Sequence, residues 1–216
     1  MRTISLGIAA LVLLSGCSAG VENVAAPTTS PSATPTPSPT PTIDPGPVLM
    51  TEEEAAEYYL RLICQSNTAG QALNDAIIAG EEEWLNGGEP DPAAVKSAAS
   101  TLLGLKRLAI EVMDDDYFTW PGEVGTHVGY IRESFIQESA VISAVANVSR
   151  YEDAYYSQFP EQTPEQAGAG QEIRYQLGID ADTTTSCVGY EAELEALHAE
   201  MIERNEYLAQ FESSDQ

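Results

Sequence analysis

The chain has 216 residues, of which 34 are acidic and 9 are basic, so its formal net charge at pH 7 is −25. Apolar residues make up 43% of the sequence and charged residues 20%, which fits one modest globular domain with appendages rather than two separate cores. Binding a polyanion requires a cationic face. The charge therefore argues against nucleic acid as a partner, and it disfavours acidic substrates and anionic lipid headgroups.

The first 16 residues are typical of a lipoprotein signal peptide. Arg2 precedes an apolar run over residues 4–14, which is shorter than the roughly 20 residues that an apolar helix needs to cross a bilayer. The segment Leu14–Cys17 resembles the lipobox of bacterial lipoproteins, in which an aliphatic and two small residues precede the lipidated cysteine. This resemblance implies that Cys17 carries a diacylglyceryl thioether and anchors the chain at the outer face of the cell membrane. The alternatives are an ordinary cleavable signal with a chance cysteine, or a short buried helix.

Residues 17–49 are expected to form a disordered linker behind the lipidated Cys17. The segment is rich in Pro, Ser and Thr and lacks the apolar residues that a core requires. A polyproline II conformation at about 3.1 Å per residue would let it reach roughly 100 Å. We interpret it as a spacer rather than a recognition motif, although its composition also suits O-glycosylation. The folded domain is expected to cover residues 50–216.

The cysteine count predicts one disulfide. If Cys17 carries lipid, Cys64 and Cys187 remain, and an even remainder in an oxidising compartment favours a bridge between them. In the chain-entropy model, closing so long a loop stabilises the fold by about 4 to 5 kcal/mol. The alternatives are two buried thiols or a metal pair. We expect neither a metal nor a cofactor, because His127 and His198 stand alone in the sequence.

Helix signals dominate the remaining sequence. Thr51 and Glu54 form a capping box that opens a first helix, and the chain is expected to break from the acidic run 81–83 to Pro90. Asp91 and Pro92 are typical of the start of a second helix. Apolar residues at three- and four-residue spacing form one stripe in each of the first three helices: Ala56, Tyr59, Leu60, Ile63, Cys64, Leu73 and Ile77; Val95, Ala98, Leu102, Leu105, Ala109 and Val112; Val124, Val128, Ile131, Phe135, Ile142 and Val145.

Two further helices complete the prediction. The third helix opens at Trp120–Pro121, and a second capping box, Thr163 with Gln166, begins a shorter helix that ends at Gly178. A last helix is expected from about residue 188 to residue 211. The sequence therefore predicts an all-α fold, an antiparallel bundle of four to five helices with one disulfide. Its aromatic residues are expected to close the ends of the core rather than to stack on a ligand: Tyr58, Tyr59, Trp84, Tyr117, Phe118 and Trp120.

Several short motifs resemble a group of uncharacterised lipoproteins of actinobacterial cell envelopes. They are the Cys-Gln-Ser-Asn of residues 64–67, the Trp-Pro of 120–121, the Arg-Tyr-Gln-Leu-Gly of 174–178, and Cys187. The resemblance covers most of residues 50–187 and leaves the last helix unmatched. It implies a secreted, disulfide-linked helical domain and no catalytic activity.

Acidic residues provide the few candidates for a chemical site. Glu138 falls on the apolar stripe of the third helix, where it is either a general acid, a salt-bridge partner of Arg174, or rotated toward water. The stretch Asp114–Asp116 is expected to be the solvated end of the second helix, with a loosely bound cation as the alternative. Asn67 is expected to bond to backbone near the disulfide.

One loop partly matches a calcium-binding pattern. Asp180, Asp182 and Thr184 occupy ligand positions of an EF-hand loop, but Thr185 stands where the sharp turn requires glycine. The favoured interpretation is a polar connection with ordinary helix-start chemistry.

These observations predict a membrane-anchored surface lipoprotein whose acidic helical domain acts as a binding or interaction module for an envelope protein or a cell-wall partner. We expect no enzymatic activity. The alternative is an envelope hydrolase or an enzyme accessory that uses carboxylates near Glu138 or Asp114–Asp116. A solute-binding lipoprotein is a third reading, and the absence of alternating strands and helices in the sequence speaks against it.

Overall fold

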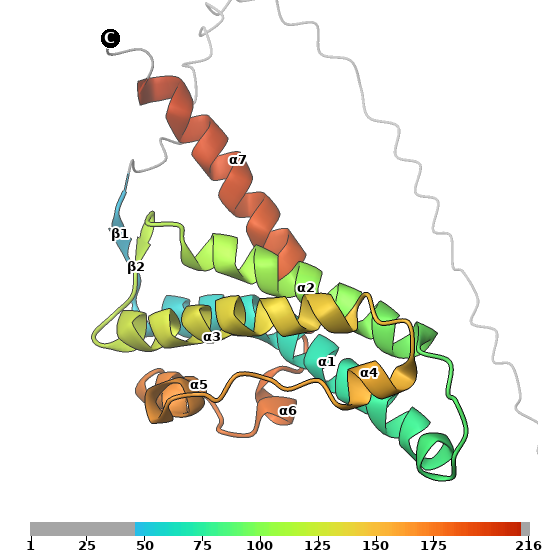
Figure 1. Cartoon of the computed structure of the whole chain (residues 1–216). Helices are drawn as coiled ribbons and strands as arrows, with labels where there is room; N and C mark the ends of the chain where they lie inside the picture. Colours follow the sequence, from blue (N-terminus) through green and yellow to red (C-terminus); the bar gives the residue numbers. More distant parts are fainter. Residues whose placement is uncertain (1–45, 213–216) are drawn as a thin grey trace, which may run out of the picture. The chain divides into compact units, whose positions relative to one another are not determined.

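The computed structural model of the chain describes residues 46–212, all of which belong to one compact unit. Five longer helices in this range form the predicted bundle, and α1, α2 and α3 run in alternating directions (Figure 1). Two helices of one turn, α4 and α6, and two short strands were not predicted. The elements are β1 Val48–Leu49, α1 Glu52–Leu85, α2 Ala93–Met113, β2 Phe118–Thr119, α3 Val124–Val145, α4 Tyr151–Tyr155, α5 Pro164–Gln176, α6 Thr183–Ser186 and α7 Leu194–Glu212.

Local signals set several helix ends as expected. The side chain of Thr51 accepts from the backbone N–H of Glu54, and the carboxylate of Glu54 accepts from the backbone N–H of Thr51, which completes the capping box of α1. Thr163 and Gln166 form the same reciprocal pair at the start of α5. Just after the end of α5, Gly178 adopts a φ of 65°, a left-handed conformation that glycine tolerates.

The break predicted at residues 81–83 is wrong, because α1 continues through them to Leu85. These last turns are held by α4. The hydroxyl of Tyr155 donates to a carboxylate oxygen of Glu81 at 2.8 Å, and the rings of Tyr155 and Trp84 stack with their centroids 4.8 Å apart. Tertiary contact therefore extends the helix past the acidic run.

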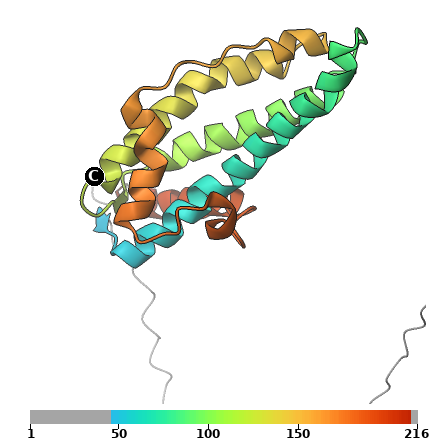
Figure 2. The same cartoon turned by 90° about the horizontal axis from the view of Figure 1, so that it is seen from below.

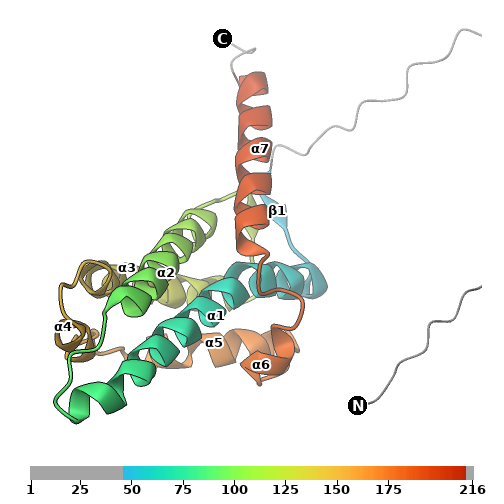
Figure 3. The same cartoon turned by 90° about the vertical axis from the view of Figure 1, so that its right-hand side faces the viewer.

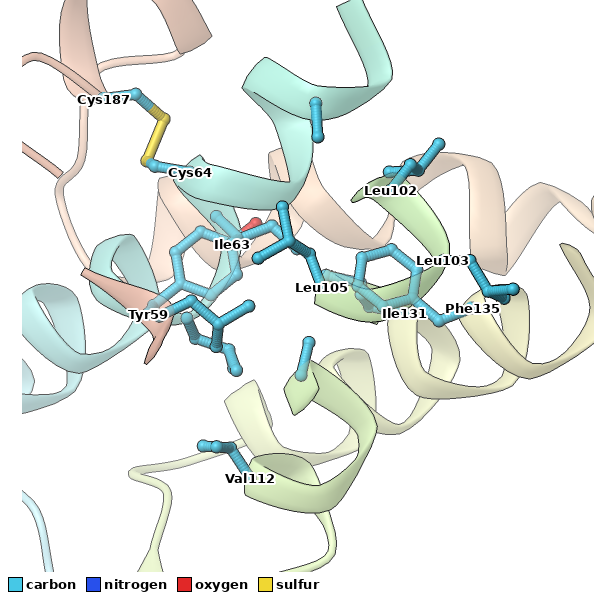
Figure 4. Packing of buried hydrophobic residues seen from close by; sticks show 14 of the residues in the cluster. Tyr59, Ile63, Cys64, Leu102, Leu103, Leu105, Val112, Ile131, Phe135 and Cys187 are labelled. Carbon is cyan, nitrogen blue, oxygen red and sulfur yellow. A yellow bond between two sulfur atoms is a disulfide. The ribbon is translucent and has the colours of Figure 1, made fainter. Parts of the chain in front are cut away.

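The core lies where the apolar stripes of α1, α2 and α3 meet. All six residues predicted for the stripe of α3 are buried, as are five of the six predicted for α2, where Ala99 takes the place of Ala98. Figure 4 shows Ile63 of α1, Leu105 of α2 and Phe135 of α3 in this packing. In α1, four of the seven predicted residues are buried, and Ala56, Leu60 and Ile77 are partly buried. The stripes of α2 and α3 therefore identify the buried faces of those helices, and the stripe of α1 does so in part.

The folded part begins earlier than the predicted boundary at Met50. Val48 and Leu49, which were assigned to the linker, pair in parallel with Phe118 and Thr119. Val48 donates its backbone N–H to Tyr117, and Met50 donates to Thr119. The sequence could not reveal this ladder, because two-residue strands show no alternation and the pairing joins segments far apart in the chain.

The predicted disulfide between Cys64 and Cys187 is present, with the two Cα atoms 5.3 Å apart (Figure 4). Cys64 lies inside α1, and Cys187 ends the short helix α6. Both cysteines are buried. The bridge therefore ties the segment before α7 to the middle of α1, across 123 residues of chain.

The last helix begins at Leu194, six residues later than predicted, because α6 and a turn at Gly189 occupy the preceding segment. The side chain of Gln65 on α1 accepts from the backbone N–H of Leu194 at 3.0 Å. Arg61 makes a two-pronged ion pair with Glu200 at 2.7 and 3.0 Å. The first turns of α7 are thus fixed to α1, and its C-terminal turns extend away from the other helices (Figures 1 and 3).

No helix in residues 46–212 is long and apolar enough to cross a membrane. The expected signal peptide, Cys17 and nearly all of the expected linker lie outside the described residues.

The contact between α4 and α1 depends on a glycine. A methyl group at Gly80 would come within 2.4 Å of the ring of Tyr151, whose hydroxyl donates to the carbonyl of Ile77. Gly70, in the same helix, has nothing within 4 Å of a methyl group placed there. Gly80 therefore makes room for α4, whereas Gly70 lies beside open space.

We predict that Gly80→Ala lowers the free energy of unfolding by about 1–3 kcal/mol, because the added methyl displaces Tyr151. Gly70→Ala is the matched control, and it should raise this free energy by about 0.5–1 kcal/mol because it only removes backbone freedom. Urea unfolding followed by circular dichroism measures both. Equal effects of the two substitutions would contradict the close approach at Gly80.

Candidate functional site

Two cavities lie side by side in the bundle and share Asn67, Phe135 and Glu138 in their walls. The first, here called the lysine cavity, has a volume of about 340 Å³ and is lined by Lys106 and by residues of α1, α2 and α3. The second, called the arginine cavity, has a volume of about 240 Å³, lies among α1, α3 and α5, and is lined by Arg174. Together they bring Lys106, Glu138 and Arg174 to one region.

An ion pair separates the two cavities. Nζ of Lys106 donates to a carboxylate oxygen of Glu138 at 2.6 Å, and the lysine and glutamate side chains are 8% and 19% exposed. Nζ also lies 3.7 Å from the ring centroid of Phe135, a cation–π distance. The expectation that Glu138 faces water alone, or pairs with Arg174, is therefore wrong, because Lys106 reaches it from α2.

Glu138 is also bound from the opposite side. Residues 156–163 run alongside α3 from α4 to α5 (Figure 2). Within this segment the Nε2 of Gln162 donates to the second carboxylate oxygen of Glu138 at 3.0 Å. Both oxygens of the carboxylate thus have a donor, so the side chain of Glu138 is held from two sides.

Lys106 is the residue that the sequence reasoning missed. It sits four residues after Leu102 and three before Ala109, on the buried stripe of α2. That spacing was the available signal. Burial lowers the pKa of Lys106, and the neighbouring carboxylate of Glu138 opposes this shift.

Arg174 was expected to be the partner of a buried carboxylate, and this expectation is wrong. Its Nη1 donates to the hydroxyl of Tyr59 at 3.1 Å and to the carbonyl of Gly170 at 3.3 Å. The residue is only 3% exposed, yet its Nε and Nη2 have no hydrogen-bond partner among the described residues. Burial raises the pKa of Tyr59, and the nearby Arg174 opposes this shift.

Within the acidic stretch Asp114–Asp116, Asp115 is more enclosed than predicted, whereas Asp114 and Asp116 are exposed. Asp114 pairs with Arg132, and Asp115, whose side chain is 5% exposed, pairs with Arg204 at 2.5 Å. The guanidinium of Arg204 lies over the ring of Tyr117. The prediction that Asp115 is solvated at the end of α2 is therefore wrong, because Arg204 of α7 pairs with it.

Burial, reinforced by the charge of Asp115, raises the pKa of Tyr58 to about 12. The ring of Tyr58 meets those of Phe118 and Trp120 edge to face. These three aromatic residues lie at the end of the bundle where α1 begins.

In the loop that partly resembles an EF-hand, the acidic side chains accept hydrogen bonds from nearby backbone N–H groups. Asp180 accepts from the backbone N–H of Asp182, and Asp182 in turn caps α6 by accepting from that of Thr184. Glu191 accepts from the backbone N–H of Gly189. Within residues 46–212 no group of three or more His, Cys, Asp or Glu side chains is arranged to hold a metal ion.

Asn67 does not take the place predicted for it. Its side chain is exposed at the rim of both cavities, whereas the hydroxyl of the neighbouring Thr68 donates to the carbonyl of Cys64 at 3.1 Å. The expected hydrogen bond next to the disulfide thus comes from Thr68.

We predict that Glu138→Gln lowers the free energy of unfolding by about 1–3 kcal/mol, because it leaves the ammonium of Lys106 buried without its counter-charge. Lys106→Met combined with Glu138→Gln should recover part of the loss in urea unfolding.

The pKa of Lys106, measured by NMR, should lie below that of a free lysine and fall further in Glu138→Gln. Because this lowered pKa penalises the charged form in the folded state, the lysine opposes folding at neutral pH. That cost disappears as the pH rises from the lowered pKa of Lys106 in the folded chain to the ordinary pKa of lysine in the unfolded chain. An unshifted lysine pKa would contradict the burial.

Searches against family models, curated proteins and solved structures give no match to this chain. Inferences about its function therefore rest on its own residues.

Proposed function

We propose that the chain is a lipoprotein anchored at the outer face of the cell membrane through Cys17, and that its helical domain binds a partner at the cell envelope. The lipobox-like segment Leu14–Cys17 supports the anchor. The disulfide supports export, because bridges form and persist in oxidising compartments and are rare in the cytosol.

The observation that carries the proposed binding role is the pair of adjoining cavities around Lys106 and Glu138. Pockets with an apolar lining and a few convergent polar groups are the usual sites of ligand recognition. Phe159, which is 46% exposed, lies at the opening of the lysine cavity.

The alternative is an envelope hydrolase or an enzyme accessory that uses carboxylates. It is less well supported, because Asp114, Asp115 and Glu138 each form an ion pair with a basic side chain. A general acid or base needs a carboxyl group that can reach substrate, and these three carboxylates are already engaged by basic side chains. We therefore favour a binding module without enzymatic activity.

Cys17→Ala should release the protein into the medium or leave an uncleaved precursor, because the acyl chains have no other attachment. Cell fractionation with mass measurement of the mature chain tests this. Unchanged membrane retention and processing would contradict the anchor.

A photo-crosslinking residue at Phe159 should capture a partner on intact cells, because this ring stands at the cavity opening. Tyr175, which is 83% exposed on α5 and lies outside both cavity walls, is the control position. Capture from Phe159 but not from Tyr175, identified by mass spectrometry, supports the binding role. Equal capture from both positions, or from neither, would contradict it.

A further inference from the structure

We propose that the end of the bundle where α1 meets α4 docks a basic segment of an envelope protein, in which Arg or Lys side chains alternate with apolar ones. The docking surface, here called the aromatic face, lies outside the walls of the lysine and arginine cavities. This inference rests on the proposed binding role and names the chemistry of the partner. The aromatic face consists of Ile78, Trp84, Leu85, Tyr155 and Tyr156.

Three aromatic rings form the centre of this face. The ring of Trp84 stacks on that of Tyr155 and meets that of Tyr156 edge to face, with the latter centroids 5.3 Å apart. The rings of Tyr155 and Tyr156 also meet edge to face, at 5.4 Å. Each ring thus contacts the other two, and together they cover the last turns of α1 from the side of α4.

Two aliphatic side chains of α1 extend the cluster. Ile78 and Leu85 are seven residues apart and therefore lie on one face of the helix, two turns from each other. Glu81 lies between them on that face and accepts from the hydroxyl of Tyr155 at 2.8 Å. The two aliphatic side chains thus border the aromatic rings.

The aromatic face is open to solvent. Leu85 is 64% exposed, and Ile78 and Tyr156 are each 56% exposed. Single apolar side chains are normal on a protein surface, whereas adjoining ones with a polar rim mark sites of protein–protein contact. The grouping of these side chains therefore indicates a docking surface.

The charge around the aromatic face selects a basic occupant. Residues 78–92 and 149–156, which form and surround it, contain seven acidic residues and one basic residue, Arg150. The guanidinium of Arg150 pairs with Glu152 and Asp153 at the start of α4. The other carboxylates of these segments are left without a cation from Arg150.

The end of α1 adds to the negative charge. Within residues 46–212, neither Glu82 nor Glu83 forms an ion pair with a basic side chain, and both are exposed. The last turn of α1 holds no basic residue, so the negative end of the helix dipole has no neighbouring cation there. Complementary charge steers a basic segment to this surface and disfavours an acidic one.

A pocket beside the aromatic face accepts a long basic side chain. It has a volume of about 430 Å³, lies between the end of α1 and the start of α4, and is lined by Trp84, Glu89 and Asp91. Arg150 also lines the pocket, but its charge is offset by its own ion pairs. Glu89 and Asp91 are exposed, so a cation in this pocket lies among carboxylates and beside an indole ring. Arginine suits both, because its guanidinium stacks on aromatic rings and pairs with carboxylates.

The position of the aromatic face leaves it accessible in an anchored chain. The end of α1 and α4 lie at the opposite end of the bundle from β1, near which the described chain begins (Figures 1 and 2). The 34 residues of α1 separate the two ends by roughly 50 Å. The described chain thus enters the domain far from the surface that we assign to the partner.

Calorimetric titration of the purified, disulfide-bonded chain with a synthetic peptide tests the proposal. In the probe peptide, pairs of Arg alternate with pairs of Leu. One control peptide has Glu in place of each Arg, and the other has Ser in place of each Leu. We expect the probe to bind at least tenfold more tightly than either control, and to bind more weakly as added salt screens the exposed charges. No binding of the probe, or equal binding of either control, would overturn the inference.

Variants of exposed apolar residues locate the contact. Tyr156→Ser combined with Leu85→Ser should weaken binding of the probe at least tenfold, because the pair removes two exposed side chains of the aromatic face. Tyr175→Ser combined with Val188→Ser is the matched control, since these side chains are 83% and 70% exposed and lie outside the face. It should leave binding unchanged. Circular dichroism checks that both variants stay folded. Full binding by the first variant, or equal loss in both, would overturn the assignment.

A second pair of variants separates local charge from net charge. Glu82→Gln combined with Glu83→Gln should weaken binding of the probe at least threefold more than Glu203→Gln combined with Glu206→Gln. Both pairs remove two negative charges from exposed positions, the first beside the aromatic face and the second on α7. Equal effects of the two pairs would mean that net charge alone attracts the peptide, and would overturn the inference.

The outcome is separable from that of the proposed function. If the probe peptide does not bind while crosslinking at Phe159 captures a partner, the envelope binding role stands and the aromatic face is not its site. If the probe binds at the aromatic face while Cys17→Ala changes neither location nor processing, the docking surface stands and the anchor fails.

Discussion

A lysine inside a helical bundle needs a carboxylate beside it to offset part of the cost of burying its charge, and Glu138 does this for Lys106. The pair connects α2 to α3 at a fixed position along both helices, and Gln162 extends the connection to the segment that precedes α5. Glu138 lines both cavities and Lys106 lines one of them. The interaction that joins the helices therefore also lies in the wall of the candidate site.

Features governed by near neighbours in the sequence were predictable. The two capping boxes involve residues three apart, and the stripe of α3 needs only the helical period, so each could be identified without knowing the fold. The disulfide was predictable for a different reason, since a single pairing remained once Cys17 was assigned to lipid.

The choice of ionic partners could not be predicted, because 34 acidic residues compete for 9 basic ones and sequence distance does not rank them. Glu138 falls on the apolar stripe of α3 in the sequence, but its partner comes from α2, 32 residues away. Arg174 was expected to pair with a carboxylate, but it donates to the hydroxyl of Tyr59 and to the carbonyl of Gly170. Asp115 becomes enclosed only because α7, which the sequence did not orient, crosses the end of α2.

The bridge between Cys64 and Cys187 turns the chain between them into a covalent ring that contains α2, α3, α4 and α5. A protease that cuts one connection inside this ring, such as residues 86–92 or 156–163, leaves two fragments still joined through sulfur. A cut between Cys187 and Leu194 lies outside the ring, and α7 is then held by side-chain contacts alone. With the disulfide formed, a single cut in any loop between the two cysteines leaves the two fragments covalently joined. A single cut in the turn before α7 removes the covalent link between this helix and the rest of the domain.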